Sequence, residues 1–465
     1  MRKFFFKRRR ERKQNRRLIV FPAIFVFSVG VCFAQVPTPT ATPSITNPQS
    51  ADTTSPVTRD QAIQMTLAQV STYNQTQLNE RLAAEDIRQS RAALLPRITA
   101  NPTVIYTSPS LARQESGLPR SPSFLGANAI TEYQGLVTAA GEIDTSGRLR
   151  ATIRRNQALL EAARNGTEAT RRTLIGSLDE AYLNLGLASI KRRAAEENLR
   201  IASEFENLTK ILVSGGEVAP IDTVRAGVQT ATRRDELSQA QLAEQQAADA
   251  LRVFIGYDFS RPVSVTDLLT SVPDLTEIER LTSDAGTTRP EIAQLFAAQR
   301  AAREDIKIAR AERRPQLTYF LDGGFISDSL RPRSIIDSLG GRATVGVTIP
   351  LFDFGASRSR QTQAELRAQS AEQSRIFAER ILAQQFNSAL LQARSARERI
   401  RLLGENIKNA EKVVEVSTLR YRAGEAPITE VTDAQTSLIA QRAALYQAIF
   451  DYQIALARLR QTVGK

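Results

Sequence analysis

Four segments of the chain alternate between apolar and polar residues, and they lie at about 98–107, 133–143, 317–326 and 342–350. In the last of these, for example, apolar residues alternate with Arg342, Thr344 and Thr348. A period of two places one kind of side chain on each face of a β-strand. About ten residues is also the length of a tilted strand that crosses a bilayer. The pattern therefore predicts four strands with one face toward lipid and one toward water.

Much longer stretches are rich in Ala, Glu, Gln and Arg, as coiled-coil helices are, and they cover 148–213, 220–255, 356–422 and 427–462. The first and third contain no proline and predict helices of roughly 100 Å, at about 1.5 Å per residue. Each is followed by a glycine-containing turn and a returning helix. Shorter helices are expected over 58–95 and 289–314, ending at Pro96 and Pro315, because the residue before proline avoids helical geometry.

The order of these elements repeats because the chain contains an internal duplication. The segment 85–92 recurs as 304–311, a shift of 219 residues. Further matched landmarks are Pro96-Arg-Ile-Thr99 with Pro315-Gln-Leu-Thr318, Asp144-Thr-Ser-Gly147 with Asp353-Phe-Gly355, and Gly216-Glu-Val-Ala-Pro-Ile221 with Gly424-Glu-Ala-Pro-Ile428. A period of about 200 residues is far longer than a solenoid repeat and indicates a tandem duplication. The predicted organisation is a first repeat at 58–256, a connector at 257–288 and a second repeat at 289–465.

The net charge of +13 is concentrated at the start of the chain. Residues 2–17 hold ten Lys or Arg and one acid, and without them 52 basic and 48 acidic residues remain, a net charge of +4. An apolar run of about 14 residues follows and ends at Cys32-Phe33-Ala34, as in a secretory signal peptide. We therefore expect a signal peptide at 1–34, a Pro/Thr-rich linker at 35–57 and no nucleic-acid partner. An uncleaved anchor and a lipidated Cys32 are the alternatives.

The composition offers few of the residues that usually carry out catalysis. The chain has no His and a single Cys, so the commonest general base and metal ligand is absent. We found no Gly-rich phosphate loop ending in Lys-Ser/Thr and no calcium loop. We therefore expect no enzyme activity, no metal and no cofactor. A periplasmic enzyme is the least favoured reading, because no coherent catalytic set is present.

The predicted strands are too few for one chain to form a membrane barrel. The smallest membrane barrels have about eight strands, and lipid cannot satisfy the open edges of a sheet. Several copies of the chain would have to pool their strands, and the long polar helices would lie in an aqueous compartment. The main alternative is a soluble, elongated coiled-coil scaffold, which leaves the signal peptide and the alternating strands unexplained.

The residues around the second glycine turn resemble the outer membrane efflux protein family, the TolC-like channels. The resemblance lies in Arg420-Tyr421-Arg-Ala-Gly424, Ile428-Thr-Glu-Val431, Asp433-Ala-Gln435 and Pro350-Leu-Phe-Asp353-Phe-Gly355, and it extends over most of 58–465. It implies a mostly α fold with a membrane β-barrel, in which a homotrimer forms twelve strands in the outer membrane and a helical tunnel through the periplasm. It also implies passive export, gated at the helical tip, in a tripartite efflux or type I secretion system.

The implied partners are outer-membrane lipid, a periplasmic adaptor (membrane fusion) protein and an inner-membrane pump of the RND or ABC type. In such channels the helix–turn–helix reversals dock the adaptor. The matching residues here are Gly215, Gly216, Glu217, Gly424 and Glu425. The glycines also permit the left-handed backbone of a tight reversal, so a plain hairpin turn explains them equally well.

The resemblance further assigns gate residues near the second turn. Glu430 and Asp433 match acidic positions that ring the constriction of the tunnel, where they would favour cations. Alternatively, these acids only complement the dipole at the start of a helix. Asp222 and Tyr421 match residues that latch the tip through polar bonds. Ala426 departs from the family, because the best-known members carry an arginine shortly after the turn glycine.

Overall fold

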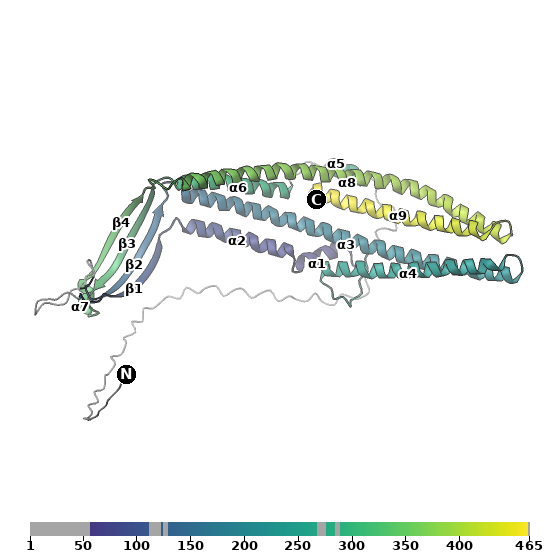
Figure 1. Cartoon of the computed structure of the whole chain (residues 1–465), viewed down its shortest axis with the longest axis horizontal. Helices are drawn as coiled ribbons and strands as arrows, with labels where there is room; N and C mark the ends of the chain where they lie inside the picture. Colours follow the sequence, from purple (N-terminus) through teal and green to yellow (C-terminus); the bar gives the residue numbers. More distant parts are fainter. Residues whose placement is uncertain (1–55, 111–121, 124–128, 267–275, 284–288, 464–465) are drawn as a thin grey trace, which may run out of the picture. The chain divides into compact units, whose positions relative to one another are not determined.

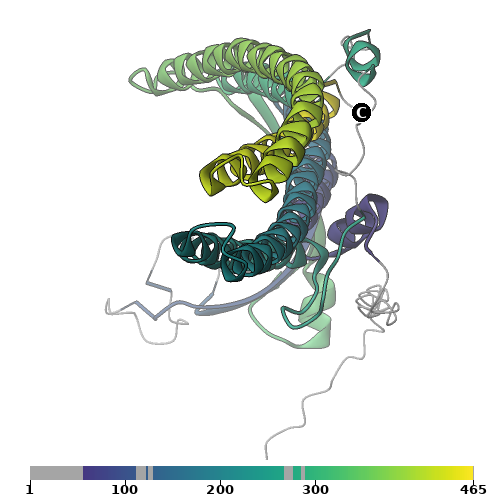
Figure 2. The same ribbon diagram turned by 90° about the vertical axis from the view of Figure 1, so that its right-hand side faces the viewer.

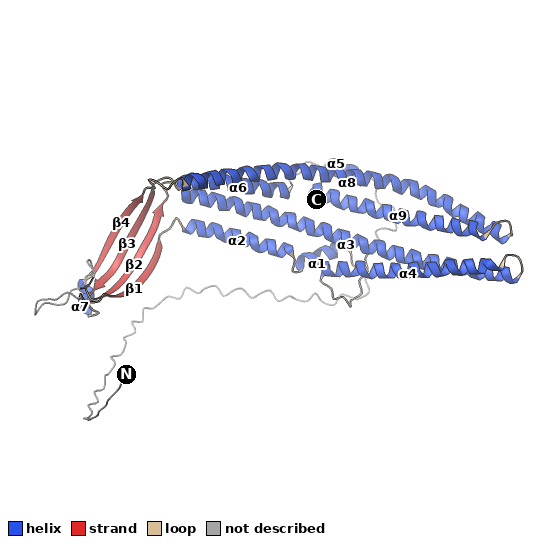
Figure 3. Ribbon diagram, in the orientation of Figure 1, coloured by secondary structure: helices blue, strands red, loops and turns tan. Residues whose placement is uncertain are grey.

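The computed structural model describes residues 56–110, 122–123, 129–266, 276–283 and 289–463. The expected signal peptide and nearly all of the linker lie outside these residues. The described part contains nine helices and four strands, and the strands gather in one sheet (Figures 1 and 3). The predicted fold class, with two copies of a helix, two strands and a long helical hairpin, is confirmed.

The four strands form one antiparallel sheet in sequence order (Figure 3). They are β1 (Arg97–Tyr106), β2 (Thr131–Ile143), β3 (Gln316–Ser327) and β4 (Leu339–Thr348). The central pair, β2 and β3, joins the first repeat to the second. In the part of the chain that the structure describes, β1 pairs only with β2 and β4 only with β3. The sheet is therefore open along two edges.

The register separates a polar face from an apolar face. Thr99, Thr138, Asp322 and Arg342 are paired in one row across all four strands. Within this row, Thr138 Oγ1 donates to Asp322 Oδ1 at 2.8 Å, and Arg342 Nη2 donates to Asp322 Oδ2 at 2.8 Å. The adjacent row points to the opposite face and consists of Ile98, Ala139, Leu321 and Ala343. The alternation in the sequence thus corresponds to two chemically different faces.

The helices are of two kinds. The short ones are α1 (Arg59–Ala68), α2 (Thr72–Ala92), α5 (Glu277–Ser283), α6 (Pro290–Ala311) and α7 (Pro332–Asp337). The long ones form two hairpins. Hairpin 1 consists of α3 (Arg148–Ser214) and α4 (Pro220–Ile255), and hairpin 2 of α8 (Ala356–Arg422) and α9 (Ile428–Val463). Both first helices have 67 residues and both returning helices have 36. The two helices of each hairpin lie side by side (Figures 1 and 2).

One predicted helix is interrupted in the structure. The segment expected to be one helix over 58–95 is divided into α1 and α2. Gln69 adopts an extended backbone at the end of α1, and Ser71 is the N-cap of α2. The side chain of Gln69 lies against Gly256 at the end of α4, where an added Cβ would meet it at 2.3 Å. This contact between segments distant in sequence accompanies the break.

The duplicated aspartates cap the two longest helices. Asp144 accepts a hydrogen bond from the backbone nitrogen of Leu149 at 3.1 Å, and Asp353 accepts one from Ser357 at 2.7 Å. The N-cap residues, Gly147 and Gly355, have φ of 81° and 88°. This geometry explains why Asp recurs two or three residues before Gly in both repeats. Each cap satisfies free N–H groups where a strand gives way to a helix.

The Asp353 cap predicts a pH dependence. Hydrogen bonds from Ser357 hold the pKa of Asp353 below its ordinary value of 3.8. The capping contribution is therefore complete above that value and is lost as pH falls through the lower pKa of the folded state. We expect Asp353→Ala to lower the thermal stability of the helices near pH 6, with the difference from wild type shrinking in acid below about pH 4. Circular dichroism melts measure this, with the exposed Asp337→Ala as the control. A pH-independent difference would contradict the capping role.

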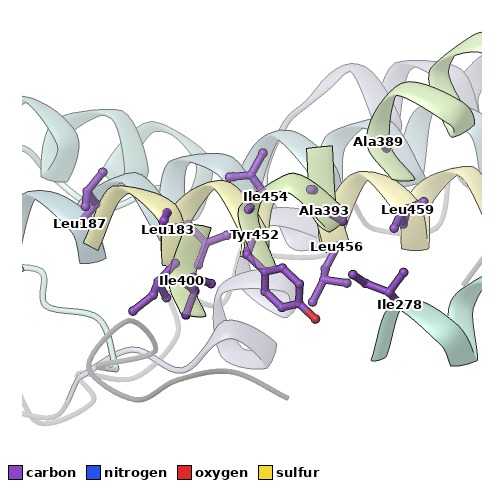
Figure 4. Close-up of a cluster of buried hydrophobic side chains, with 14 of the residues drawn as sticks. Leu183, Leu187, Ile278, Ala389, Ala393, Ile400, Tyr452, Ile454, Leu456 and Leu459 are labelled. Atoms are coloured by element: carbon purple, nitrogen blue, oxygen red, sulfur yellow. The ribbon is translucent and has the colours of Figure 1, made fainter. Parts of the chain in front are cut away.

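The core joins both repeats through packed helices (Figure 4). Leu183 and Leu187 of α3 belong to the same buried cluster as Tyr452 and Leu456 of α9 and Ile278 of α5. A second cluster lies around Tyr182, whose hydroxyl donates to the backbone oxygen of Val57 at 2.8 Å. Among the described residues, no helix is both long enough and apolar enough to span a membrane.

Candidate functional site

The candidate site is the end of the two hairpins, where both chain reversals have the same backbone geometry. Glu217 N donates to Leu212 O at 3.0 Å in the first turn, and Glu425 N donates to Arg420 O at 2.9 Å in the second. These six-to-one bonds are Schellman motifs, which require a residue with positive φ. Gly216 and Gly424 supply it, with φ of 78° and 71°. The two turns are therefore structural equivalents.

Gly215 does not have the left-handed backbone expected from the sequence. Its φ is −78° and its ψ is −11°, which any L-residue can adopt. The reason is that a Schellman motif needs only one left-handed residue, and Gly216 fills that position. Ala423 stands at the equivalent place in the second turn and also has negative φ. Glu217 and Glu425 are both exposed, so each turn presents one carboxylate to solvent.

A buried apolar cluster joins the two hairpins close to the turns. It consists of Phe205 (α3), Ala226 (α4), Tyr421 (α8), Ile428 and Val431 (α9), and we call it the tip cluster. The rings of Phe205 and Tyr421 lie 5.5 Å apart between centroids. Burying a large apolar side chain contributes about 1.5–3 kcal/mol. Apolar packing therefore accounts for much of the attraction between the hairpins at this end.

Asp222 and Tyr421, which the resemblance assigns to the latch, are both buried near the turns, and no direct hydrogen bond joins them in the described part of the chain. Tyr421 is fully buried, and its hydroxyl has no well-aligned hydrogen-bond partner among the described residues. Burial raises the pKa of the Tyr421 phenol and the charge of Asp222 adds to this, while the nearby Thr209 hydroxyl opposes it. A buried, unsatisfied hydroxyl costs about 1–3 kcal/mol. Asp222 itself faces Arg225 at 3.5 Å.

The two candidate constriction acids differ in their surroundings. Glu430 Oε1 accepts a hydrogen bond from Arg420 Nη1 at 2.7 Å across the second turn, and Ser417 lies within 3.4 Å of the same oxygen. Asp433 lies one helical turn further along and has no ion pair in the described part of the chain. No described side chain therefore pairs with the charge of Asp433, whereas Arg420 largely balances that of Glu430.

This difference predicts unequal roles in ion selectivity. We expect Asp433→Asn to reduce cation preference about twofold or more, and Glu430→Gln to have a smaller effect, because Arg420 already offsets that carboxylate. Arg420→Gln is expected to increase cation preference by freeing Glu430. Reversal potentials in planar bilayers under a salt gradient measure these effects. Equal changes for the two acids, or no change for Arg420→Gln, would refute the assignment.

Sequence reasoning missed several residues of this site. Phe205 lies more than 200 residues from Tyr421, so no local pattern signals their contact. Arg420 and Glu430 lie on opposite sides of the turn, so the sequence does not signal the hydrogen bond between them. Ala426 itself is buried. Among the described residues, no group of three or more His, Cys, Asp or Glu side chains is placed to hold a metal ion.

Comparison with known proteins gives a consistent result. Residues 62–257 and 281–465 match the family model described as "Outer membrane efflux protein". The pyoverdine export outer membrane protein OpmQ of Pseudomonas aeruginosa is 23% identical over 404 residues, 82% of this chain and 80% of that protein. The cation efflux system protein CusC of Escherichia coli is 26% identical over 348 residues, with 73% and 74% covered. The outer membrane protein VceC of Vibrio cholerae superimposes with a TM-score of 0.77 at 18% identity, covering 87% of this chain and 96% of that one.

Proposed function

The chain belongs to the outer membrane efflux protein family, and from this premise we propose that three copies form the exit duct of a tripartite efflux or type I secretion system. The family places the chain in the outer membrane as a channel protein. The observation that carries the trimer is the open sheet, with its polar and apolar faces and its two unpaired edges. Three chains would contribute about twelve strands, enough to close a membrane barrel.

The duplicated hairpins also support assembly with further copies. Ile428 and Val431 are 1% and 0% exposed, because Phe205 and neighbouring side chains of hairpin 1 cover them. Their equivalents in hairpin 1, Ile221 and Val224, are 52% and 60% exposed. On hairpin 2, the residues that correspond to Phe205 and Leu208 are the exposed Val413 and Val416. Within the chain, apolar side chains of α3 thus cover those of α9. The equivalent residues on α8 and α4 are exposed, so α8 of one copy can cover α4 of a neighbouring copy in the same way.

In this proposal the helices form a periplasmic tunnel, and the tip cluster holds its end closed. Asp433, supported by Glu430, would set the charge of the constriction, and Asp222 and Tyr421 would take part in the latch. The exposed turns carrying Gly215, Gly216, Glu217, Gly424 and Glu425 would dock a periplasmic adaptor, which connects to an RND or ABC pump. The named relatives export pyoverdine and cations, so the family as a whole does not fix one cargo.

The experiment that tests the proposal is purification of the mature chain from membranes. We expect detergent-dependent solubility, a mass of three chains by light scattering, and discrete ion conductance in planar bilayers. A cysteine pair at Val224 and Val416, both exposed within one chain, should form a cross-link between copies. A water-soluble monomer without conductance would overturn the proposal and favour the coiled-coil scaffold.

A further inference from the structure

The two hairpins contact each other in two apolar zones separated by a gap. One zone is the core that contains Leu187 and Ile449, and the other is the tip cluster. Between them lies a cavity of about 420 Å³, lined by side chains from α3, α4 and α9, among them Ile190, Ala240 and Tyr446. Apolar packing between the two hairpins is thus interrupted partway along their length. Polar side chains of α4 and α9 face each other near this interruption.

Two hydrogen bonds link α4 to α9 next to this gap. Gln229 Nε2 donates to Gln435 Oε1 at 3.2 Å, and Arg233 Nη2 donates to Thr436 Oγ1 at 3.2 Å. Arg233 also binds both carboxylate oxygens of Glu236 through Nη1, at 2.8 and 2.9 Å. We call Gln229, Arg233, Gln435 and Thr436 the α4–α9 clasp. Its residues lie about two to four helical turns from the chain reversals, away from Asp222 and Tyr421.

Arg233 and Gln435 are buried, Gln229 is half-buried and Thr436 is exposed, so the clasp borders solvent and depends on the distance between the hairpins. Arg233 is only 8% exposed, and a guanidinium stays charged in such a place, so its donors need acceptors. Thr436 on the other hairpin is one of them. Gln229 Oε1, by contrast, is buried without a hydrogen-bond partner. Moving α9 away would break the Arg233–Thr436 bond, which disfavours opening. It would also admit water to Gln229 Oε1, which favours opening.

We propose that the α4–α9 clasp sets the spacing of the two hairpins and so controls how readily the tip opens, with Arg233 as its positioning residue. The inference rests on the proposed function as a gated duct and adds a control point within that function. In this proposal, the core that contains Leu187 and Ile449 stays packed while the tip opens. The contacts of the clasp and of the tip cluster must break when the tip opens.

Two variants test the clasp directly. Arg233→Met keeps the apolar stem and removes the donors, and Thr436→Val keeps the shape and removes the acceptor. We expect each to raise single-channel open probability at least about tenfold, equivalent to about 1.4 kcal/mol in the closed-to-open equilibrium. The double variant should open little more than either single one, because both remove the same bond. Arg234→Met is the matched control, since this exposed arginine adjoins Arg233 and makes no bond to α9.

The outcomes separate the clasp from the channel function itself. If wild-type protein and Arg234→Met conduct and gate normally while Arg233→Met and Thr436→Val behave identically to them, the clasp proposal fails and the channel stands. If wild-type protein does not conduct, the proposed function fails. If Arg233→Met does not assemble, the gating of Thr436→Val alone decides whether the clasp proposal stands. As a converse test, joining a Gln229→Cys/Gln435→Cys pair with a flexible bis-maleimide cross-linker should hold the channel closed. Unchanged gating despite a confirmed cross-link would also overturn the clasp.

Discussion

Gly324→Ala is expected to prevent the central strands of the sheet from pairing and so to abolish assembly of the channel. Gly324 has φ of 150°, a backbone region that is essentially restricted to glycine, and a Cβ built on it would lie 2.0 Å from the backbone oxygen of Gly135. Because the obstacle is backbone on the neighbouring strand, β2 would have to move away from β3. We expect a loss of at least about 3 kcal/mol from the strained backbone and the displaced strand pairing together.

The adjacent glycine provides a matched control for this prediction. Gly323 has no atom within 4 Å of an added Cβ, so Gly323→Ala should assemble as the wild type does. The measurement is the amount of folded protein in the outer-membrane fraction, together with the resistance of the oligomer to dissociation on unheated gels. At about 1.4 kcal/mol per factor of ten, the folding equilibrium constant of Gly324→Ala should fall at least about a hundredfold. Normal yield of Gly324→Ala would show that the two strands can separate there at little cost.

The elements of this fold were predictable because each has a local signature. A period of two marked the four strands, and the equal landmarks of the two repeats predicted two hairpins of similar length. The recurring Asp was recognised as a landmark but not as a cap, because its hydrogen bonds reach backbone N–H groups whose position depends on the adjoining strand. The break between α1 and α2 escaped prediction for a related reason, since Gln69 contacts Gly256 at the distant end of α4.

The candidate site was only partly predictable, because the duplication hides a difference between its copies. Glycine and acid recur in both turns, and from the sequence alone the two turns look interchangeable. In the structure, Ile428 is buried by hairpin 1, whereas its equivalent Ile221 is exposed. Which copy is covered depends on the packing of one hairpin against the other. Hence Glu430, Asp433, Asp222 and Tyr421 could be placed at the tip by resemblance, but their partners could not.

Tyr421 gives the sharpest test of what keeps the tip closed. A latch made of polar bonds predicts that Tyr421→Phe opens the channel as strongly as Tyr421→Ala. The structure predicts a large difference between them, because the ring packs against Phe205 while the hydroxyl has no well-aligned hydrogen-bond partner in the described part of the chain. Removing the buried ring should cost about 3–5 kcal/mol of closed-state stability. Removing the unsatisfied hydroxyl alone should be nearly neutral or favour closure.

Single-channel recordings can measure both substitutions as open probability. We expect Tyr421→Ala to be open most of the time and Tyr421→Phe to resemble the wild type. Phe205→Ala should act like Tyr421→Ala, and combining the two should add less than their sum, since they remove one shared contact. If Tyr421→Phe opens the channel as far as Tyr421→Ala does, then the hydroxyl, through Asp222 or Thr209, holds the gate and apolar packing is secondary. Because the tip cluster is the only buried apolar cluster described at this end of the hairpins, its loss should leave the α4–α9 clasp as the main contact that resists opening.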